Sequence, residues 1–465
     1  MKALHALLIA IGAGLLASQA HANPYASQLS SSTADFDPVE TQTVELGFYL
    51  NEDADSVIVE VFGPLPDTDT LRTFDLGALA PGAHSVEWDG KDDAEDLVPM
   101  GEDYSFRVLT ESAGYGDWTN ITPTDGGDQI ASTYYPHPTS LAVIRNMDSP
   151  HFGVVAVANS VPGDNGFDAE QGLYLLNSDL SWYGGSATAS FNAAMNDPAA
   201  PWDPDASNSP YKVKAGKDDG MLYTSDWGIN VVYRSDLQDT GVQVLAEGGE
   251  HDSLLTAMTT GTGAETVLWG IQEGARTDIV RWNIGDDVPH TGDPELFANV
   301  PGASQLRDIG FDGDGNVYVS LQPSTDGQAA LAKFDPDGNE LWTQTRGDLM
   351  AQGYPTDPGE PLWFLGMTHH DGLLYVIDAR AIIVALFDAE TGAFVADFFN
   401  VPDLAGFTGR SLDVDAAGNV YITDNNGGVV SVWSPWGPSD FTTMYYGTIT
   451  AGEGPVAVPE WRAYD

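Results

Sequence analysis

Apolar and polar side chains alternate with a period of two residues in five short segments near the start of the chain, at 43–50, 56–63, 71–77, 84–90 and 104–110. This period is typical of β-strands that bury one face and expose the other. Turn residues such as Gly, Asp and Pro separate the segments. Five short alternating strands in one run predict a small β-sandwich over residues 37–112.

A different unit follows residue 130 and is clearest at 308–341: a strand, a tight Asp-Gly-Asn turn and two more strands. Its second strand recurs as VVAVAN, LYTSDW, VLWGIQ, VYVSLQ, LYVIDA and VYITDN, with starts 68, 45, 50, 57 and 46 residues apart. Repetition near the length of a four-stranded blade predicts a six-bladed β-propeller over residues 130–465. The predicted fold class is therefore all-β, a small immunoglobulin-like sandwich followed by a propeller. An insertion at 186–212 accounts for the longest spacing and is a candidate binding loop.

The predicted sandwich carries a distinctive turn sequence. Residues 81–93 read PGAHSVEWDGKDD, followed by VPMG at 98–101 and YSFRV at 104–108. These motifs resemble the immunoglobulin-like domain of the flagellar hook-capping (FlgD-like) family. Trp88 is then expected to fill the sandwich core in front of the Asp-Gly turn. The resemblance implies a spacer or protein-contact module without catalytic residues.

The propeller repeats also resemble a known group. The segments DIGFDGDGNVYVS at 308–320 and SLDVDAAGNVYITDN at 411–425 are similar to repeats of NHL and virginiamycin-lyase-like six-bladed propellers. This resemblance implies the fold and leaves the function open, because one propeller scaffold serves many activities. Gluconolactonase-type propellers hold a metal with acidic and Asn ligands, the first a Glu in the first blade, and residues 139–143 contain no such Glu.

The N-terminal residues predict export. Residues 1–22 combine a lysine, an apolar run and a small-x-small site, which is typical of a secretory signal peptide cleaved after Ala22. The mature protein is then expected in the periplasm or outside the cell, without membrane insertion and, lacking cysteine, without disulfides. Residues 23–36 are interpreted as a flexible arm and 113–129 as a linker. Strand addition by this arm to a neighbouring subunit is an alternative that predicts self-assembly.

Charge limits the partners further. Asp and Glu number 69 against 17 Lys and Arg, for a net charge of −52. Such a surface repels nucleic acid and anionic lipid, so neither is an expected partner. Salt screens self-repulsion, so the acidity is interpreted as a halophilic adaptation; binding of Ca²⁺ by part of this surface is the alternative.

The few arginines are placed unevenly. Arg307 and Arg410 directly precede innermost strands, whereas Arg276 and Arg380 follow second strands. All four positions fall in loops on one predicted face of the propeller. Two interpretations stay open: a basic patch at the channel mouth that holds a carboxylate or other anionic group, or ion pairs between blades. The expected partners for such pairs are Asp308, Asp378 and Asp413.

The same predicted mouth carries further candidates. His137 and His251 precede inner strands, and Trp227 follows a second strand directly. Asp226, Asp378 and Asp424 each end a second strand, where they either cap the next turn or form a carboxylate ring. In the second case Asp226, Asp424 and Asn425 are the candidate ligands of a Ca²⁺ ion.

Two further loops look like calcium loops. Residues 312–316 and 335–339 lack the Gly and Glu that an EF-hand requires. They are interpreted as hairpin turns.

These features predict an exported binding or scaffolding protein. Its propeller and immunoglobulin-like module are expected to contact another protein or an extracellular polysaccharide. The first alternative is a hydrolase or lyase acting on a carbohydrate or lactone at the channel mouth, with Ca²⁺ as the candidate cofactor. The second is a subunit of an extracellular filament. No nucleophile motif, Walker loop or dinucleotide fingerprint occurs in the sequence.

Overall fold

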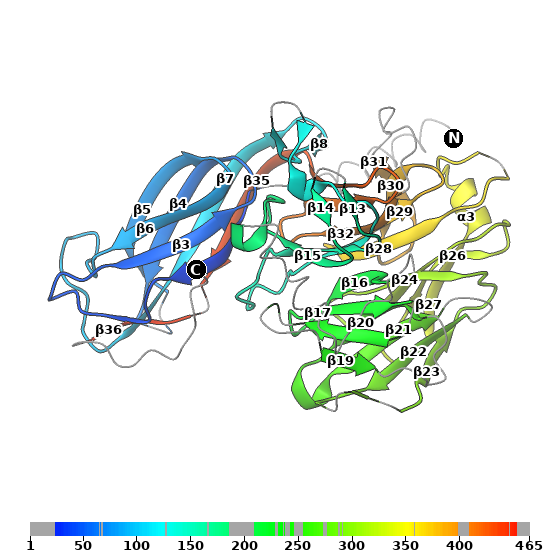
Figure 1. Ribbon diagram of the computed structural model, residues 1–465, viewed down its shortest axis with the longest axis horizontal. Helices are drawn as coiled ribbons and strands as arrows, with labels where there is room; N and C mark the ends of the chain where they lie inside the picture. The colour runs from blue at the N-terminus through cyan, green and yellow to red at the C-terminus, as the bar shows by residue number, and fades with distance from the viewer. Residues whose placement is uncertain are drawn as a thin grey trace, which may run out of the picture.

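The computed structural model describes residues 24–64, 66, 68–125, 128–164, 167–185, 209–227, 231–235, 237, 242–245, 254–272, 277–286, 289–290, 292–357, 359–398, 409–445 and 447–452. The predicted signal peptide and most of the 186–212 insertion lie outside these residues. Figure 1 shows a sandwich at one end of the molecule and a propeller at the other. The predicted fold class is confirmed. Among the described residues, no helix combines the length and hydropathy that crossing a bilayer requires.

The sandwich consists of two packed sheets. The first has the order β1-β3-β6, formed by β1 (Ala26–Ser31), β3 (Val44–Leu50) and β6 (Gly82–Trp88). The second has the order β2-β36-β7-β4-β5, formed by β2 (Asp35–Phe36), β36 (Ile449–Ala451), β7 (Asp103–Tyr115), β4 (Ala54–Phe62) and β5 (Thr70–Leu79). A further strand, β35 (Gly437–Met444), also pairs with β7.

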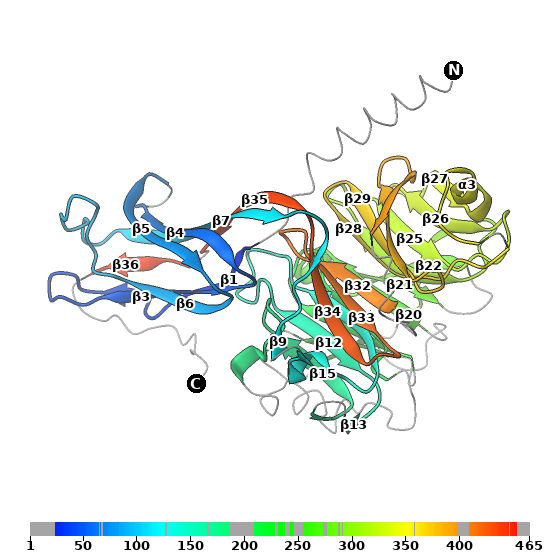
Figure 2. The same cartoon turned by 90° about the horizontal axis from the view of Figure 1, so that it is seen from above.

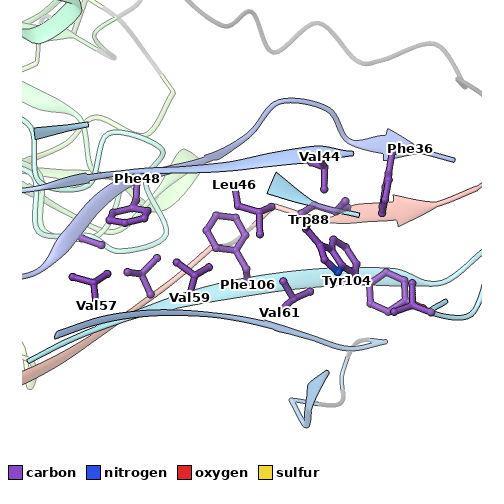
Figure 3. Packing of buried hydrophobic residues seen from close by; sticks show 14 of the residues in the cluster. Phe36, Val44, Leu46, Phe48, Val57, Val59, Val61, Trp88, Tyr104 and Phe106 are labelled. Carbon is purple, nitrogen blue, oxygen red and sulfur yellow. The ribbon is translucent and has the colours of Figure 1, made fainter. Parts of the chain in front are cut away.

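Trp88 lies in the centre of the sandwich core, as its sequence context predicted. Its side chain is fully buried, and its ring centroid lies 5.2 Å from that of Phe36 and 5.5 Å from that of Tyr104. Figure 3 shows the Trp88 ring among these core side chains. The indole N–H donates to the Lys91 carbonyl at 3.0 Å, so the polar atom of this side chain is satisfied. Gly90 turns the chain behind it with a φ of +72°.

The propeller is built from six small antiparallel sheets within the described residues. Their strands, from the inside outward, are β11 (Pro138–Val143), β12 (Val155–Asn159) and β15 (Gly172–Leu176); β16 (Lys212–Ala215), β17 (Leu222–Asp226), β18 (Val231–Ser235) and β19 (Val242–Leu245); β20 (Leu254–Thr260), β21 (Val267–Gln272), β22 (Asp278–Asn283) and β23 (Glu295–Asn299); β24 (Leu306–Phe311), β25 (Val317–Leu321), β26 (Ala329–Phe334) and β27 (Glu340–Thr345); β28 (Phe364–His370), β29 (Leu373–Asp378), β30 (Ile383–Asp388) and β31 (Phe394–Phe398); and β32 (Gly409–Val414), β33 (Val420–Asp424), β34 (Val429–Ser434) and β8 (Thr119–Asn120).

The inner strands form a closed ring, because each contacts the inner strand of the next blade and β32 contacts β11. Short pieces lie outside the blades: the helix α3 (Arg346–Ala351), the 3-10 turns η1 (Ala131–Thr133), η2 (Tyr183–Gly185) and η3 (Gly263–Glu265), and the two-residue strand pairs β9 (Thr124–Asp125) with β10 (Asp128–Gln129) and β13 (Gly163–Asp164) with β14 (Asp168–Ala169). The predicted closure into six blades is therefore observed.

The chain crosses between the two domains more often than the sequence predicted. Residues 119–120, within the expected linker 113–129, form β8, which pairs with β34 as the outer strand of the last blade. Residues 437–444 and 449–451, expected in the propeller, pair with β7 in the sandwich. The orange β35 beside the cyan β7 in Figure 2 marks this return. The domain bounds at 112 and 465 therefore need correction, because each domain is completed by a strand from the other end of the chain.

The expected flexible arm is also part of the sandwich. Residues 26–31 pair with β3 and residues 35–36 with β36. Ala26 and Phe36 belong to the buried core, and their burial explains why this segment is ordered without a clear alternating pattern. The interpretation of residues 23–36 as a free arm is wrong.

The sandwich packs directly on the propeller. Tyr25 is fully buried between the rings of Phe152, on the β11–β12 hairpin, and Phe441 in β35, at 5.4 and 5.7 Å. The Tyr49 hydroxyl lies 2.7 Å from the Ser181 hydroxyl, so hydrogen bonds add to the aromatic contact. These contacts join the two domains into one unit.

A carboxyl group is buried beside this interface. Glu52 accepts hydrogen bonds from the Tyr115 hydroxyl at 2.9 Å and the Ser434 hydroxyl at 3.1 Å. Burial raises the pKa of Glu52 to about 7 because the charged form loses its hydration. Asp415, on the propeller side, is also buried, and its pKa is raised to about 6 for the same reason.

The return of β35 to β7 depends on Gly114. A Cβ at Gly114 would lie 1.5 Å from the Gly437 carbonyl oxygen, and its φ is +73°. Gly101 has a similar φ of +77° and open space around its Cβ position, so Gly101→Ala is the matched control. We expect Gly101→Ala to lower the free energy of unfolding by about 1–2 kcal/mol through backbone strain alone. Gly114→Ala should lose about 1–3 kcal/mol more, because β35 must shift. Equal losses of unfolding free energy in the two variants, measured by urea denaturation, would contradict the role of Gly114 in the pairing of β35 with β7.

The buried Glu52 predicts a pH dependence of stability. Its carboxyl stays protonated in the folded protein while the unfolded chain ionises, so its contribution to stability falls as pH rises from about 4.5 to about 7. The free energy of unfolding of the wild type should therefore fall relative to that of Glu52→Gln, by up to about 3 kcal/mol. Urea titrations of both proteins across this range in about 1 M NaCl, which screens other charges, measure the difference. Parallel pH profiles of the two unfolding free energies would contradict this prediction.

Candidate functional site

The inner strands are joined across blades by carboxylates that accept backbone hydrogen bonds. Asp308 in β24 accepts from the Met367 amide of the next blade at 2.9 Å. Asp413 in β32 accepts in the same way from the Val143 amide at 2.9 Å. Because a charged acceptor strengthens such bonds, the repeated aspartates hold neighbouring blades in register around the axis.

Two lysines extend across the propeller axis to one of these aspartates. Lys212 and Lys214 lie two residues apart in β16, so their side chains leave the same face of the strand. Both ammonium groups lie 3.0 Å from the same oxygen of Asp308, which is fully buried. They also donate to the carbonyls of Leu365 at 2.6 Å and Met367 at 3.1 Å in β28. This cluster connects blades two, four and five.

The observed partners of these aspartates differ from the predicted arginine pairs. Asp308 is paired with lysines and not with an arginine. Asp378 accepts from the Tyr354 hydroxyl at 3.0 Å, from the Trp363 amide before β28, and from the amides of Arg380 and Ala381 in its own turn. Asp413 has a long pair with Arg145 at 3.9 Å. The sequence analysis missed Lys212 and Lys214, although two lysines at strand spacing in a chain with so few were the available signal.

Burial and the mutual attraction of the charged groups shift the pKa values within the cluster. It lowers the pKa of Lys212 to about 8, opposed by the attraction of Asp308. The two ammonium groups hold the pKa of Asp308 below its usual range although its burial acts in the other direction.

The channel has two ends. At the strand-start mouth, where the inner strands begin, the structure brings together some of the predicted residues. The Arg410 guanidinium donates to the Tyr211 hydroxyl at 3.4 Å, and the Trp227 ring lies 6.1 Å from that of Tyr211. His137 bonds the Ser160 hydroxyl at 2.6 Å, and burial together with the nearby Arg410 lowers its pKa.

The other predicted arginines are arranged differently. Arg307 donates to the side chains of Gln305 and Gln322. Arg380 pairs with Glu360 at 2.9 Å in a solvent-exposed position. Arg276 and His251 lie outside the described residues.

The candidate calcium ligands form turn and packing contacts. Asp424 accepts from the amides of Asn426 at 3.1 Å and Gly427 at 3.0 Å, which caps the turn after β33. Asp226 is fully buried and accepts from the Ser209 hydroxyl. Asn425 donates to the Pro138 carbonyl at 3.4 Å. Over the described ranges, no group of three or more His, Asp or Glu gathers as a metal site would.

The loops that look like calcium loops are hairpin turns. Asp312 accepts from the amides of Asp314 at 3.0 Å and Asn316 at 2.9 Å, and from the Tyr318 hydroxyl at 2.8 Å. Asp335 makes equivalent bonds to Asp337 and Asn339. This agrees with their interpretation from the sequence.

A cavity opens at the other end of the channel, where the inner strands end. It encloses about 610 Å³ and is lined from all six blades. We call it the strand-end cavity and define it by Arg145, Lys214, Lys217, Met258, Phe311, His369 and Asp413. It lies on the side that carries the sandwich, because the β11–β12 hairpin supplies both Arg145 to the cavity and Phe152 to the interface. The sequence analysis had placed its candidate site at the opposite mouth.

A second cavity of about 460 Å³ adjoins the first between blades four and five. The two share Asp312, Gly313 and the histidines 369 and 370. Lys333 lies over the Tyr318 ring at 5.3 Å and pairs with Glu390 at 3.0 Å. We call this the outer cavity.

Both histidines are half-buried between the cavities. The His369 ring stacks on Tyr318 with centroids 5.6 Å apart, and burial lowers its pKa. Burial also lowers the pKa of His370 to about 4, although Asp371 lies 3.5 Å away. Near neutral pH both rings are therefore uncharged and able to donate and accept hydrogen bonds.

The chain is similar to known proteins in two regions. Residues 33–114 match the FlgD Ig-like domain family. A FlgD structure from P. aeruginosa is 24% identical over 21% of this chain and 68% of its own, with a TM-score of 0.16. Virginiamycin B lyase from Staphylococcus aureus is 13% identical over 72% of this chain and 100% of its own, with a TM-score of 0.40. A putative gluconolactonase is 12% identical over 69% and 92%, with a TM-score of 0.41. No curated protein matches the sequence.

The lysine cluster predicts a large effect of Asp308→Asn. Removing the carboxylate leaves two buried ammonium groups without a counter-charge, so we expect the free energy of unfolding to fall by about 3–5 kcal/mol. Glu295→Gln is the control, because Glu295 pairs with Arg281 at 3.1 Å on the surface and should lose less than about 1 kcal/mol. Denaturant unfolding of both variants measures the two losses, and similar losses would refute the assigned role of Asp308.

Proposed function

We propose that this protein is an exported, non-catalytic binding protein whose propeller and immunoglobulin-like sandwich together contact an extracellular polymer or another exported protein. The observation that carries the proposal is the exchange of strands between the domains. β8 completes the last blade and β35 and β36 complete the sandwich, so a partner meets one platform with a fixed arrangement. Pre-organisation of this kind lowers the entropic cost of binding.

The arrangement of the candidate residues favours binding over catalysis. Catalysis requires an acid, a base or a nucleophile converging on one position. At the strand-start mouth, Arg380 pairs with Glu360 and Asp424 caps a turn. On the axis, Asp308 is neutralised by two lysines.

Export and salt adaptation are part of the proposal and rest on the sequence. The first 22 residues have the features of a signal peptide, and the net charge of −52 suits a saline medium. The filament alternative is less favoured, because strands β1 and β2 of the expected arm are already paired within the chain.

The proposal predicts binding without turnover. The mature chain from residue 23, in saline buffer, is mixed with a panel of neutral and carboxylated polysaccharides. Affinity electrophoresis reports retention, while reducing-end and unsaturated-product assays report hydrolysis and elimination. We expect retention by at least one polymer, with its chain length unchanged. Shortening of a polymer would establish the enzyme alternative, and retention by none would leave only a protein partner.

A further inference from the structure

We propose that the strand-end cavity binds a sugar acid, with Arg145 and Lys217 holding the carboxylate of a uronate unit. The unit is either a free sugar acid or part of a carboxylated polysaccharide. This inference rests on the proposed binding function and names the ligand class of one surface. It places the site at the mouth opposite to the one predicted from the sequence.

Several of the few positively charged side chains line the strand-end cavity. The whole chain has 17 Lys and Arg against 69 Asp and Glu. Three of these cations, Arg145, Lys214 and Lys217, line the strand-end cavity, and Lys333 lines the outer cavity beside it. In so acidic a protein, a small anion meets less repulsion here than over the surrounding surface.

Two of these cations, Arg145 and Lys217, face acidic neighbours only at long distance. The Arg145 guanidinium donates to the His369 carbonyl at 2.9 Å, and this bond fixes the direction of the guanidinium. Its nearest distance to the Asp413 carboxylate is 3.9 Å. The Lys217 ammonium group is 3.9 Å from Asp218. Both 3.9 Å separations are longer than a hydrogen bond. By comparison, the Arg107 guanidinium lies 2.6 Å from the Glu60 carboxylate. Arg145 and Lys217 are also about a quarter exposed, at 28% and 26%. Both retain N–H groups for a ligand oxyanion.

Carboxylates in the cavity lining favour a sugar acid over a denser polyanion. The cavity is also lined by the carboxylates of Asp148, Asp218, Asp312 and Asp413. These groups repel a ligand with a charge at every unit, such as an acidic peptide. Carboxylates and the uncharged ring of His369 are good acceptors for hydroxyl groups. The mixed lining therefore suits a ligand with one carboxylate among several hydroxyls.

The volume of the cavity also suits a sugar ligand. Ligand sites for small molecules commonly enclose about 300–1,000 Å³. The strand-end cavity, at about 610 Å³, holds more than one sugar unit, and the outer cavity continues it through the shared histidines. A short oligosaccharide can therefore extend from the axis to the space between blades four and five.

The ligand class is tested by calorimetric titration of the mature protein at constant ionic strength. The probes are glucuronate, an aldotriouronic acid with one glucuronate and two neutral sugar units, the neutral maltotriose and tri-glutamate. We expect both uronates to bind, and maltotriose and tri-glutamate to bind at least about tenfold more weakly. A monomer that binds as well as the trimer indicates a free sugar acid, whereas a tighter trimer indicates a polysaccharide. Equal binding of tri-glutamate, or no binding of either uronate, overturns the proposal.

The position of the site is tested by charge-removing variants. Arg145→Gln and Lys217→Gln should each weaken uronate binding about tenfold or more, since each removes a charge-assisted hydrogen bond. Arg380→Gln is the matched control, because Arg380 is paired with Glu360 away from both cavities, and its affinity should stay unchanged. Thermal melting checks folding, and Lys217→Gln provides a second variant if Arg145→Gln is unstable.

The result also separates this inference from the proposed function. Loss of affinity in Arg410→Gln but not in Arg145→Gln would move the site to the strand-start mouth and overturn the inference. Retention by a neutral polymer without uronate binding would do the same while leaving the binding function intact. Cleavage of a uronate polymer would instead overturn the proposed non-catalytic function.

Discussion

The architecture depends on strands that each domain receives from the far end of the chain. β7 in the sandwich pairs with β35 from residues 437–444, and the last blade is closed by β8 from residues 119–120. Unpaired edges expose backbone donors and acceptors, so neither the sandwich nor the propeller ring is complete without the other. The two domains are therefore joined by shared strands, with Tyr25 packed between them.

Lys and Arg are scarce in this protein, so the few cations at the axis and the cavity matter both for stability and for the candidate site. Lys212 and Lys214 neutralise Asp308 on the axis, and Arg145 donates a hydrogen bond to the His369 carbonyl at the strand-end cavity. A buried carboxylate needs such compensation because it has lost its hydration. Glu52 has no cation among its principal interactions, and its pKa rises accordingly. Stability and candidate recognition thus use the same small set of lysines and arginines.

The candidate site was only partly predictable. His137, Trp227 and Arg410 do gather around Tyr211 at the strand-start mouth, because residues flanking inner strands share one end of the ring. The strand-end cavity was not foreseen, although Arg145 and Lys217 each lie two residues beyond the end of an inner strand, β11 and β16. His369 lies within β28 of blade five, and only closure of the ring brings it beside Arg145.

The sequence by itself determined the all-β class, the six repeats and the Trp88 core, because each follows from period-two alternation or a short turn motif that acts locally. Tertiary structure alone decided which strands complete each domain and which end of the channel carries the cavity. Strand pairing across more than 300 residues, such as Ser439 with Ser112, is governed by exposed edges and packing, and these exist only once the ring has closed.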